Sequence, residues 1–211
     1  LNGRTLNGRT LNGTLFAGTQ VVDGQVVTVS GAEMIGSLLT IRVDGVDLTL
    51  RFDDIYKDPA NPTGDVYFYD VSVHDAVAGT WTSLCADDEG QPVAAIPLQH
   101  YWNDVTGARV NDADAVTFAC RGAVLAKCVE WGYRPWASET RCVNGTCTQV
   151  SLADYHQACT RMARADYCGD GTPHTFDATP IDLYDRLSAP VQAEATKNMS
   201  GWAIEAEWGP N

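Results

Sequence analysis

Residues 151–175, SLADYHQACTRMARADYCGDGTPHT, combine the clearest helix pattern of the chain with two of its cysteines and two of its histidines. Ser151 can cap the first turn, and Asp154, three residues later, completes a pattern like a capping box. Gly169 and the Asp-Gly turn after it are typical of a helix end. These signals predict a helix over about residues 151–168.

One face of the predicted helix carries residues three and four positions apart: Leu152, Tyr155, His156, Cys159, Met162, Ala163 and Asp166. The other side carries polar residues: Gln157, Thr160, Arg161 and Arg164. Two polar side chains, His156 and Asp166, are therefore expected on the buried face. We expect His156 to bond to backbone, and Asp166 to accept hydrogen bonds from backbone or arginine donors.

Seven cysteines point to disulfides in an oxidising compartment. They are Cys85, Cys120, Cys128, Cys142, Cys147, Cys159 and Cys168. No C-x-x-C pair and no Cys/His ladder suggests structural zinc. Three bridges leave one thiol, which is free, bridged to another chain, or paired with a cysteine outside this sequence.

One of these disulfides follows from local geometry. Asn144-Gly145 predicts a two-residue hairpin turn that places Cys142 opposite Cys147. Cys159 and Cys168 cannot pair within one helix, because nine residues rise about 13 Å. Each must bind another part of the fold, and we expect Cys159 to tie the helix to a β-rich region.

That β-rich region extends from Thr19 to about Trp136, where short apolar segments alternate with turn residues. Its strongest hairpin is IRVDGVDLTLRF, residues 41–52. Further strands are expected at residues 20–22, 25–29, 66–74, 79–85, 94–102, 115–119 and 123–133, with a last one at 201–208. The spacing predicts a mainly β protein, an antiparallel sandwich or barrel with one disulfide-anchored helix.

Residues 1–18, LNGRTLNGRTLNGTLFAG, repeat with a period of five at Leu1, Leu6, Leu11 and Phe16. This period predicts a pentapeptide-like β-coil, with Asn-Gly at each corner. Three or four units are too few to be stable alone, so the segment continues upstream or docks on a partner. A flexible linker is the alternative. We therefore separate a repeat segment, 1–18, from a β-rich disulfide-stapled domain, 19–211.

The net charge of −13 and the scattered basic residues argue against nucleic acid or an anionic membrane as a partner. No apolar run approaches the roughly 18–20 residues that span a bilayer. The chain begins at Leu1 without an initiator Met or a signal peptide, as expected of a mature or trimmed protein.

Two residue sets resemble hydrolytic sites. Cys159, His156 and Asp166 are the residue types of a nucleophilic thiol site, which needs an exposed thiolate. A disulfide role for Cys159 is favoured in a chain with seven cysteines. His174 with Asp170 is the second set. Neither set yields a catalytic assignment.

Other clusters suggest ligands. Three aromatic residues beside Arg134 could form a carbohydrate-stacking platform, although a core role is favoured: Trp131, Tyr133 and Trp136. Acidic loops could hold Ca²⁺, although structural loops are favoured: Asp170 and Asp177 near His174, and Asp87, Asp88 and Glu89. We expect no cofactor, with Ca²⁺ as the one metal candidate.

Several motifs resemble the ADYC-domain family of predicted secreted bacterial proteins: Ala165-Asp-Tyr-Cys168, Cys120-Arg-Gly-Ala-Val-Leu-Ala-Lys-Cys128, Gly132-Tyr-Arg-Pro-Trp136, His156-Gln-Ala-Cys159-Thr-Arg-Met162 and Gly169-Asp-Gly-Thr-Pro-His-Thr175. They cover roughly residues 117–185, and the upstream Leu-Asn-Gly repeats are similar too. The family has no established activity, so it transfers no catalytic residue. The resemblance implies bacterial export, a disulfide-stapled fold, and a chain that continues past Asn211 toward a further cysteine.

Together these features predict a non-enzymatic extracellular structural or surface-assembly protein. It would be a repeating subunit of a filament or coat, docked through its N-terminal segment onto itself or another surface protein. A carbohydrate-binding or adhesion module and a secreted hydrolase are the alternatives.

Overall fold

The computed structural model describes residues 4–5, 7–43, 45–61, 64–176 and 178–210. The chain forms two compact units: a first unit of residues 1–99 and 113–122, and a second unit of residues 100–112 and 123–211. The described part is mainly β, with antiparallel sheets and disulfides, which confirms the predicted fold class. Its sheets do not close into a barrel, and it has two α-helices where one was predicted.

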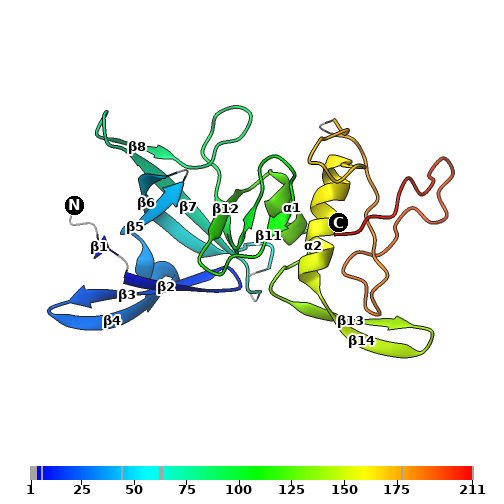
Figure 1. Ribbon diagram of the computed structural model, residues 1–211, viewed down its shortest axis with the longest axis horizontal. Helices are drawn as coiled ribbons and strands as arrows, with labels where there is room; N and C mark the ends of the chain where they lie inside the picture. Colours follow the sequence, from blue (N-terminus) through cyan, green and yellow to red (C-terminus); the bar gives the residue numbers. More distant parts are fainter. Residues whose placement is uncertain (1–3, 6, 44, 62–63, 177, 211) are drawn as a thin grey trace. The chain divides into compact units, whose positions relative to one another are not determined.

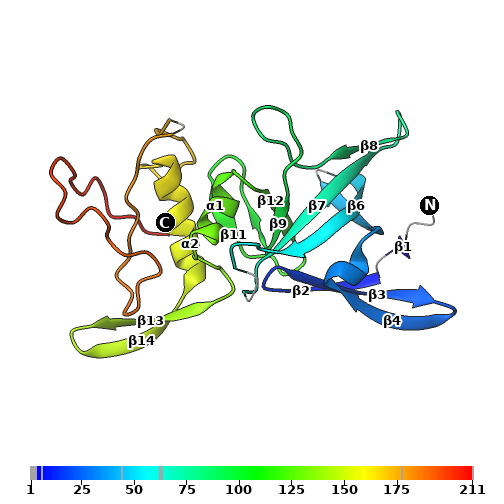
Figure 2. The same ribbon diagram turned by 180° about the vertical axis from the view of Figure 1, so that it is seen from behind.

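The main element of the first unit is a seven-stranded sheet of order β1-β5-β6-β7-β9-β12, with β8 paired to β7 (Figures 1 and 2). All its pairings are antiparallel except β1 with β5. The strands are β1 (Arg4–Thr5), β5 (Ser37–Val43), β6 (Val46–Lys57), β7 (Tyr67–Asp75), β8 (Thr80–Ser83), β9 (Ala95–Gln99) and β12 (Val116–Cys120).

A second sheet of three strands, which we call the N-terminal sheet, also belongs to the first unit. It runs in order through β2 (Asn7–Asn12), β3 (Leu15–Val22) and β4 (Gln25–Ser30), and a 3-10 helix, Gly31–Met34, follows. The predicted pentapeptide coil is wrong here. Leu11 pairs with Phe16 across a hairpin, so their five-residue spacing reflects strand register across a turn. Leu1 and Leu6 lie outside the described residues.

Phe16 anchors the N-terminal sheet in the core of the first unit. Its ring lies 5.7 Å from those of Phe52 and Tyr69, and all three side chains are buried. The Phe16 amide donates to the Tyr69 hydroxyl at 2.9 Å, and that hydroxyl donates to the Thr14 carbonyl at 3.0 Å. β3 therefore runs across the predicted boundary at residue 18 and is part of the folded unit.

The second unit contains two hairpins and both helices: β10 (Tyr101–Trp102), β11 (Arg109–Val110), α1 (Val124–Glu130), β13 (Ser138–Val143), β14 (Thr146–Ser151) and α2 (Leu152–Arg164). The strand predicted at 123–133 is wrong, because its Leu, Ala, Lys and Glu residues favour the helix that forms as α1. The described residues after Arg164 form neither helix nor strand, so the strand predicted at 201–208 is also wrong. No helix of the described residues is long and apolar enough to span a membrane.

Candidate functional site

Helix α2 positions most of the unusual side chains. The Ser151 side chain caps its start by accepting from the Ala153 amide at 3.1 Å. The helix ends earlier than the predicted residue 168, because Ala165 turns into the left-handed region with φ 49°. The Asp166 amide then donates to the Arg161 carbonyl at 2.9 Å, closing the last turn. Cys168 consequently lies beyond the helix.

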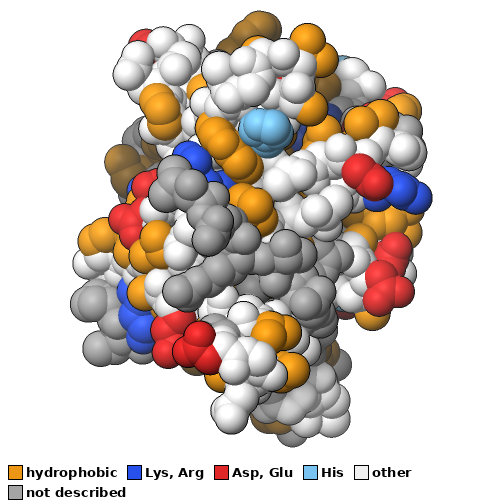
Figure 3. Space-filling model, turned by 90° about the vertical axis from the view of Figure 1, so that its left-hand side faces the viewer, with side chains coloured by type: hydrophobic (Ala, Val, Ile, Leu, Met, Phe, Trp, Pro, Cys, Tyr) orange, Lys and Arg blue, Asp and Glu red, His pale blue; other side chains and the backbone are white. Residues whose placement is uncertain are grey.

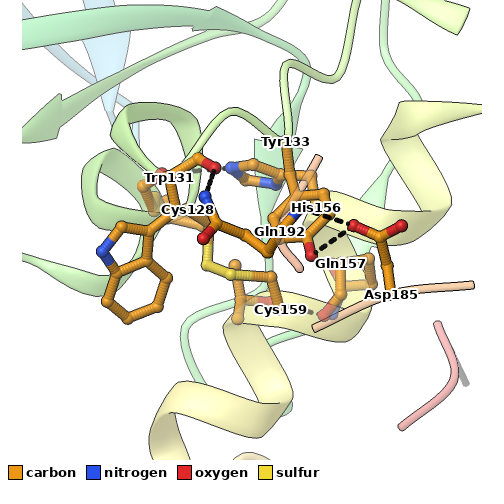
Figure 4. The surroundings of a disulfide bond; sticks show 10 residues. Cys128, Trp131, Tyr133, His156, Gln157, Cys159, Asp185 and Gln192 are labelled. Atoms are coloured by element: carbon orange, nitrogen blue, oxygen red, sulfur yellow. Dashed lines mark hydrogen bonds between the residues drawn. A yellow bond between two sulfur atoms is a disulfide. The ribbon is translucent and has the colours of Figure 1, made fainter. Parts of the chain in front are cut away.

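A disulfide between Cys128 and Cys159 joins α1 to α2 (Figure 4). Cys159 thus ties α2 to residue 128, within the region that we expected to be β-rich, but this part of the region is helix α1 and not a strand. Both cysteines are buried beside Tyr133, whose hydroxyl donates to Asp185 at 3.0 Å. The bond fixes the contact between the two helices.

The remaining five cysteines form two disulfides and leave one free thiol. Cys142 and Cys147 are directly paired residues of the β13–β14 hairpin and form a disulfide, with Cα atoms 4.0 Å apart. Cys85 bonds to Cys120 within the first unit. Cys168, which we expected to bind another part of the fold, is exposed with a free thiol. It is the seventh cysteine that three bridges leave over.

Gln157 connects α2 to the β10–β11 hairpin. Its side-chain oxygen accepts from the Trp102 indole at 2.9 Å and from the Arg109 amide at 3.1 Å. Its side-chain nitrogen donates to the Gly107 carbonyl at 3.0 Å. The sequence placed Gln157 and Arg161 on the open side of the helix, but both are buried, because the hairpin and the chain after α2 cover that side. The amphipathic pattern of the helix sequence indicates one buried face and does not show that its polar face is buried as well.

Asp166 is the centre of a buried ionic network. Its carboxylate accepts from the Arg161 guanidinium at 2.9 Å, and both side chains are almost fully buried. The same carboxylate accepts from the amides of Asp170 and Gly171, each at 3.1 Å. It therefore holds the end of α2 and the following turn together, in the arginine and backbone role predicted for it.

His156 is fully buried between α2 and α1. Its Nε2 lies 3.0 Å from the Leu125 carbonyl, which fits a neutral ring that donates from this nitrogen. Nδ1 has no partner among the described residues. Burial, with a smaller effect from the Arg109 charge, lowers the pKa of His156 to about 4, although the Leu125 contact raises it. The ring supports packing and is not exposed to a substrate.

Because His156 is buried, we expect the second unit to become less stable at acidic pH. Unfolded His156 takes up a proton near pH 6.5, whereas the folded residue does so only near pH 4. The contribution of the neutral ring to the free energy of unfolding is therefore complete above pH 6.5 and is lost as the pH falls toward 4. The free energy of unfolding of the second unit should lose about 3 kcal/mol over this range. Urea unfolding followed by tryptophan fluorescence at several pH values measures this loss.

The matched variants are His156→Gln, whose amide can still donate to Leu125, and His174→Gln at an exposed position. The first should flatten the pH dependence, and the second should leave it unchanged. Identical pH profiles for His156→Gln and the unmodified protein would contradict the role of His156.

Comparison with known families gives one match. A family model described as "ADYC domain" matches residues 31–211, most of the chain. The chain belongs to the ADYC-domain family. No curated protein and no solved structure matches it. The ADYC match begins directly after β4, so the N-terminal sheet lies outside it.

The ADYC tetrapeptide has a structural explanation in this fold. Ala165 ends α2 in the left-handed conformation, and Asp166 is the buried hub described above. Tyr167 points to the C-terminal chain, where its ring lies 5.2 Å from that of Trp208 and its hydroxyl bonds to Glu205. Cys168 is exposed. The first three residues thus dock the chain after α2.

The C-terminal chain has no regular structure but is organised by two carboxylates. Asp185 accepts from the Tyr133 hydroxyl and from the Gln192 amide at 2.9 Å. Asp182 accepts from the Thr196 hydroxyl at 2.5 Å and its amide at 2.8 Å, and these bonds lower the pKa of Asp182. Hydrogen bonds to side chains therefore organise this segment, which has no helix or strand.

A groove of about 1070 Å³ lies within the second unit. We call it the C-terminal groove. Its walls come from α2, the β13–β14 hairpin and the C-terminal chain, and its aromatic lining includes Tyr155, Tyr184 and Trp202. The lining has six acidic and three basic side chains, so it disfavours anionic ligands. The sequence did not reveal this groove, because an irregular segment forms one wall.

The described residues of the predicted ligand sites lie in different settings. Tyr133 is buried while Trp131 and Trp136 are half-buried, so the three do not present one open platform. Cys159 is in a disulfide and has no thiol to act as a nucleophile. No group of three or more His, Cys, Asp or Glu side chains that could hold a metal occurs among the described residues. Asp177, one predicted Ca²⁺ ligand, lies outside them.

Proposed function

We propose that this ADYC-domain protein is a non-enzymatic extracellular structural protein that assembles on a bacterial surface. It would be a repeating subunit of a filament or coat, docked through its N-terminal sheet. Three disulfides fit an extracellular protein, because such bonds persist in oxidising compartments. Among the side chains that Figure 3 colours on one face, Lys and Arg lie in separate places, in keeping with a partner other than nucleic acid.

The observation that carries this proposal is the exposed apolar tip of the N-terminal sheet. Val21 and Val26 pair directly across β3 and β4 and are 62% and 72% exposed. Within the described residues, β2 and β4 have no further strand on their outer sides. Open strand edges with apolar side chains favour pairing with another chain. This sheet also precedes the part matched by the family.

Removing residues 1–18 would not test assembly, because it would also remove Phe16 from the core. A point change at the exposed tip avoids this problem. We expect Val26→Glu to reduce self-association about tenfold or more while leaving the fold intact, because a charge on an edge strand opposes pairing. Light scattering over a concentration series measures the association, and far-UV circular dichroism checks the fold.

The matched control is Val46→Glu. Val46 is a 59% exposed valine at the tip of the β5–β6 hairpin, a similar setting in the same unit. The Val46→Glu variant should associate like the unmodified protein. Monomers at every concentration of the unmodified protein, or equal losses in the two variants, would refute assembly through the N-terminal sheet.

A further inference from the structure

We infer that the disulfide between Cys142 and Cys147 is a redox-sensitive clasp on the β13–β14 hairpin. A reductant that carries two thiols opens this bond selectively and releases the hairpin, which forms one wall of the C-terminal groove. The rest of the second unit stays folded. Such control acts on the groove and is independent of the proposed assembly.

Solvent access separates this bond from the other two disulfides. Cys142 and Cys147 are both exposed. Each of the other bonds includes at least one buried cysteine: Cys85 in one, and Cys128 and Cys159 in the other. A reducing thiolate must reach a sulfur atom of the disulfide, so exposed disulfides are the labile ones. Attack at a buried cysteine requires local unfolding first, whereas attack on the hairpin bond does not.

The hairpin depends on this disulfide because it has no buried side chains of its own. All residues of β13 and β14 are exposed or half-buried. A two-stranded hairpin without a buried face is marginally stable in water. Loss of the covalent bond therefore lets the hairpin open locally. The contact between α1 and α2 is unaffected, because the bond between Cys128 and Cys159 still holds it.

The turn of the hairpin makes this opening reversible. Asn144 and Gly145 have φ 51° and 81°, as a type I′ hairpin turn requires. The turn is favoured by its own residues, so it keeps the two reduced cysteines close to each other. They are separated by only five positions in the sequence, and closing so short a loop costs little entropy. The bond can therefore form again in place.

The hairpin is connected to the groove through its side chains and its backbone. The side chains of Arg141 and Val150 line the groove. The Ser188 amide, which belongs to the C-terminal chain, donates to the Thr140 carbonyl at 2.9 Å. Opening of the hairpin displaces these two side chains and removes an anchor of the C-terminal chain. Reduction therefore loosens the groove on this side.

The reaction is a thiol–disulfide exchange in two steps. One thiolate of the reductant attacks the sulfur of one hairpin cysteine, so that the S–S bond breaks, the other cysteine leaves as a thiolate, and a mixed disulfide forms. The second thiol of the reductant then attacks the mixed disulfide and releases the first cysteine. The two protons of the reductant pass to the cysteines, which become thiols, and the reductant is oxidised to its own disulfide.

Timed reduction of the folded full chain with dithiothreitol tests the selectivity of the clasp. Samples are quenched with acid, alkylated and analysed by peptide mass spectrometry, which follows each disulfide separately. We expect the Cys142–Cys147 bond to be reduced about tenfold or more faster than either of the other bonds. Oxidised dithiothreitol should then restore it. Equal rates for all three bonds, or failure of this bond to form again, would overturn the clasp.

Hydrogen exchange measures the effect on the hairpin and the groove. After selective reduction, the amides of β13, β14 and Ser188 should exchange about tenfold or more faster, while those of α2 stay unchanged. The double variant Cys142→Ser with Cys147→Ser should exchange fast without reductant. Cys168→Ser, which removes the exposed free thiol, should behave like the unmodified protein. Slow exchange in the reduced hairpin, or an unchanged Ser188 amide, would refute control of the groove by this bond.

Discussion

Asp166→Ala should cost the second unit about 3–5 kcal/mol of its free energy of unfolding, the range for removing one partner of a buried ion pair. The change leaves the Arg161 guanidinium buried without its carboxylate. It also removes the acceptor for the amides of Asp170 and Gly171. Urea unfolding followed by tryptophan fluorescence is a suitable measurement, because every tryptophan except Trp81 lies in the second unit.

Asp170→Ala is the control for this change. Asp170 is an exposed carboxylate four residues away that accepts from the Thr172 amide at 2.9 Å. Its loss should cost about 1 kcal/mol, the net value of an ordinary hydrogen bond. If the two variants unfold at the same urea concentration, Asp166 is not the hub that the geometry indicates.

Gly171→Ala should have an effect of similar size for a steric reason. Gly171 has φ +89°, and a Cβ atom there would overlap the Val105 carbonyl oxygen and lie 2.9 Å from the Thr106 carbonyl carbon. The backbone cannot yield as a flexible side chain would, so the turn after α2 must separate from the β10–β11 loop. We expect a loss of about 3–5 kcal/mol from the combined backbone strain and overpacking.

Gly201→Ala isolates the steric part of this loss. Gly201 has nearly the same φ, +92°, lies in the same unit, and has nothing within 4 Å of an added Cβ. It should lose only the left-handed backbone penalty of about 1–2 kcal/mol. Thermal unfolding of both variants measures the difference. Equal losses would mean that the contact with Val105 does not restrict this turn.

Local signals predicted the regular part of the fold. The Asn144-Gly145 turn places Cys142 opposite Cys147, and Ser151 caps α2, because each of these depends on residues close in sequence. The same applies to most strands between residues 15 and 120, whose alternation or turn residues mark them. The family resemblance was likewise carried by short motifs, most of them in the second unit.

Long-range packing explains what the sequence did not reveal. Phe16 belongs to a core completed by β6 and β7, so a local five-residue period could not indicate its role. The burial of Gln157 depends on a hairpin about 50 residues earlier in the chain. The partner of Cys159 was not predicted, because Cys128 lies in a short segment that we expected to be a strand and that forms α1 instead. The groove depends on a segment with no periodicity at all.

The disulfides also determine how this protein would respond to proteases. Residues 100–112 belong to the second unit, and Cys85 and Cys120 lie before and after them in the chain. Cys128 and Cys159 lie before and after the β13–β14 hairpin. Exposed loops and hairpin tips are the usual sites of cleavage. A cut within residues 100–112 or within the β13–β14 hairpin leaves both fragments covalently joined, and they separate only under reducing conditions. A nicked molecule therefore stays in one covalent piece until its disulfides are reduced.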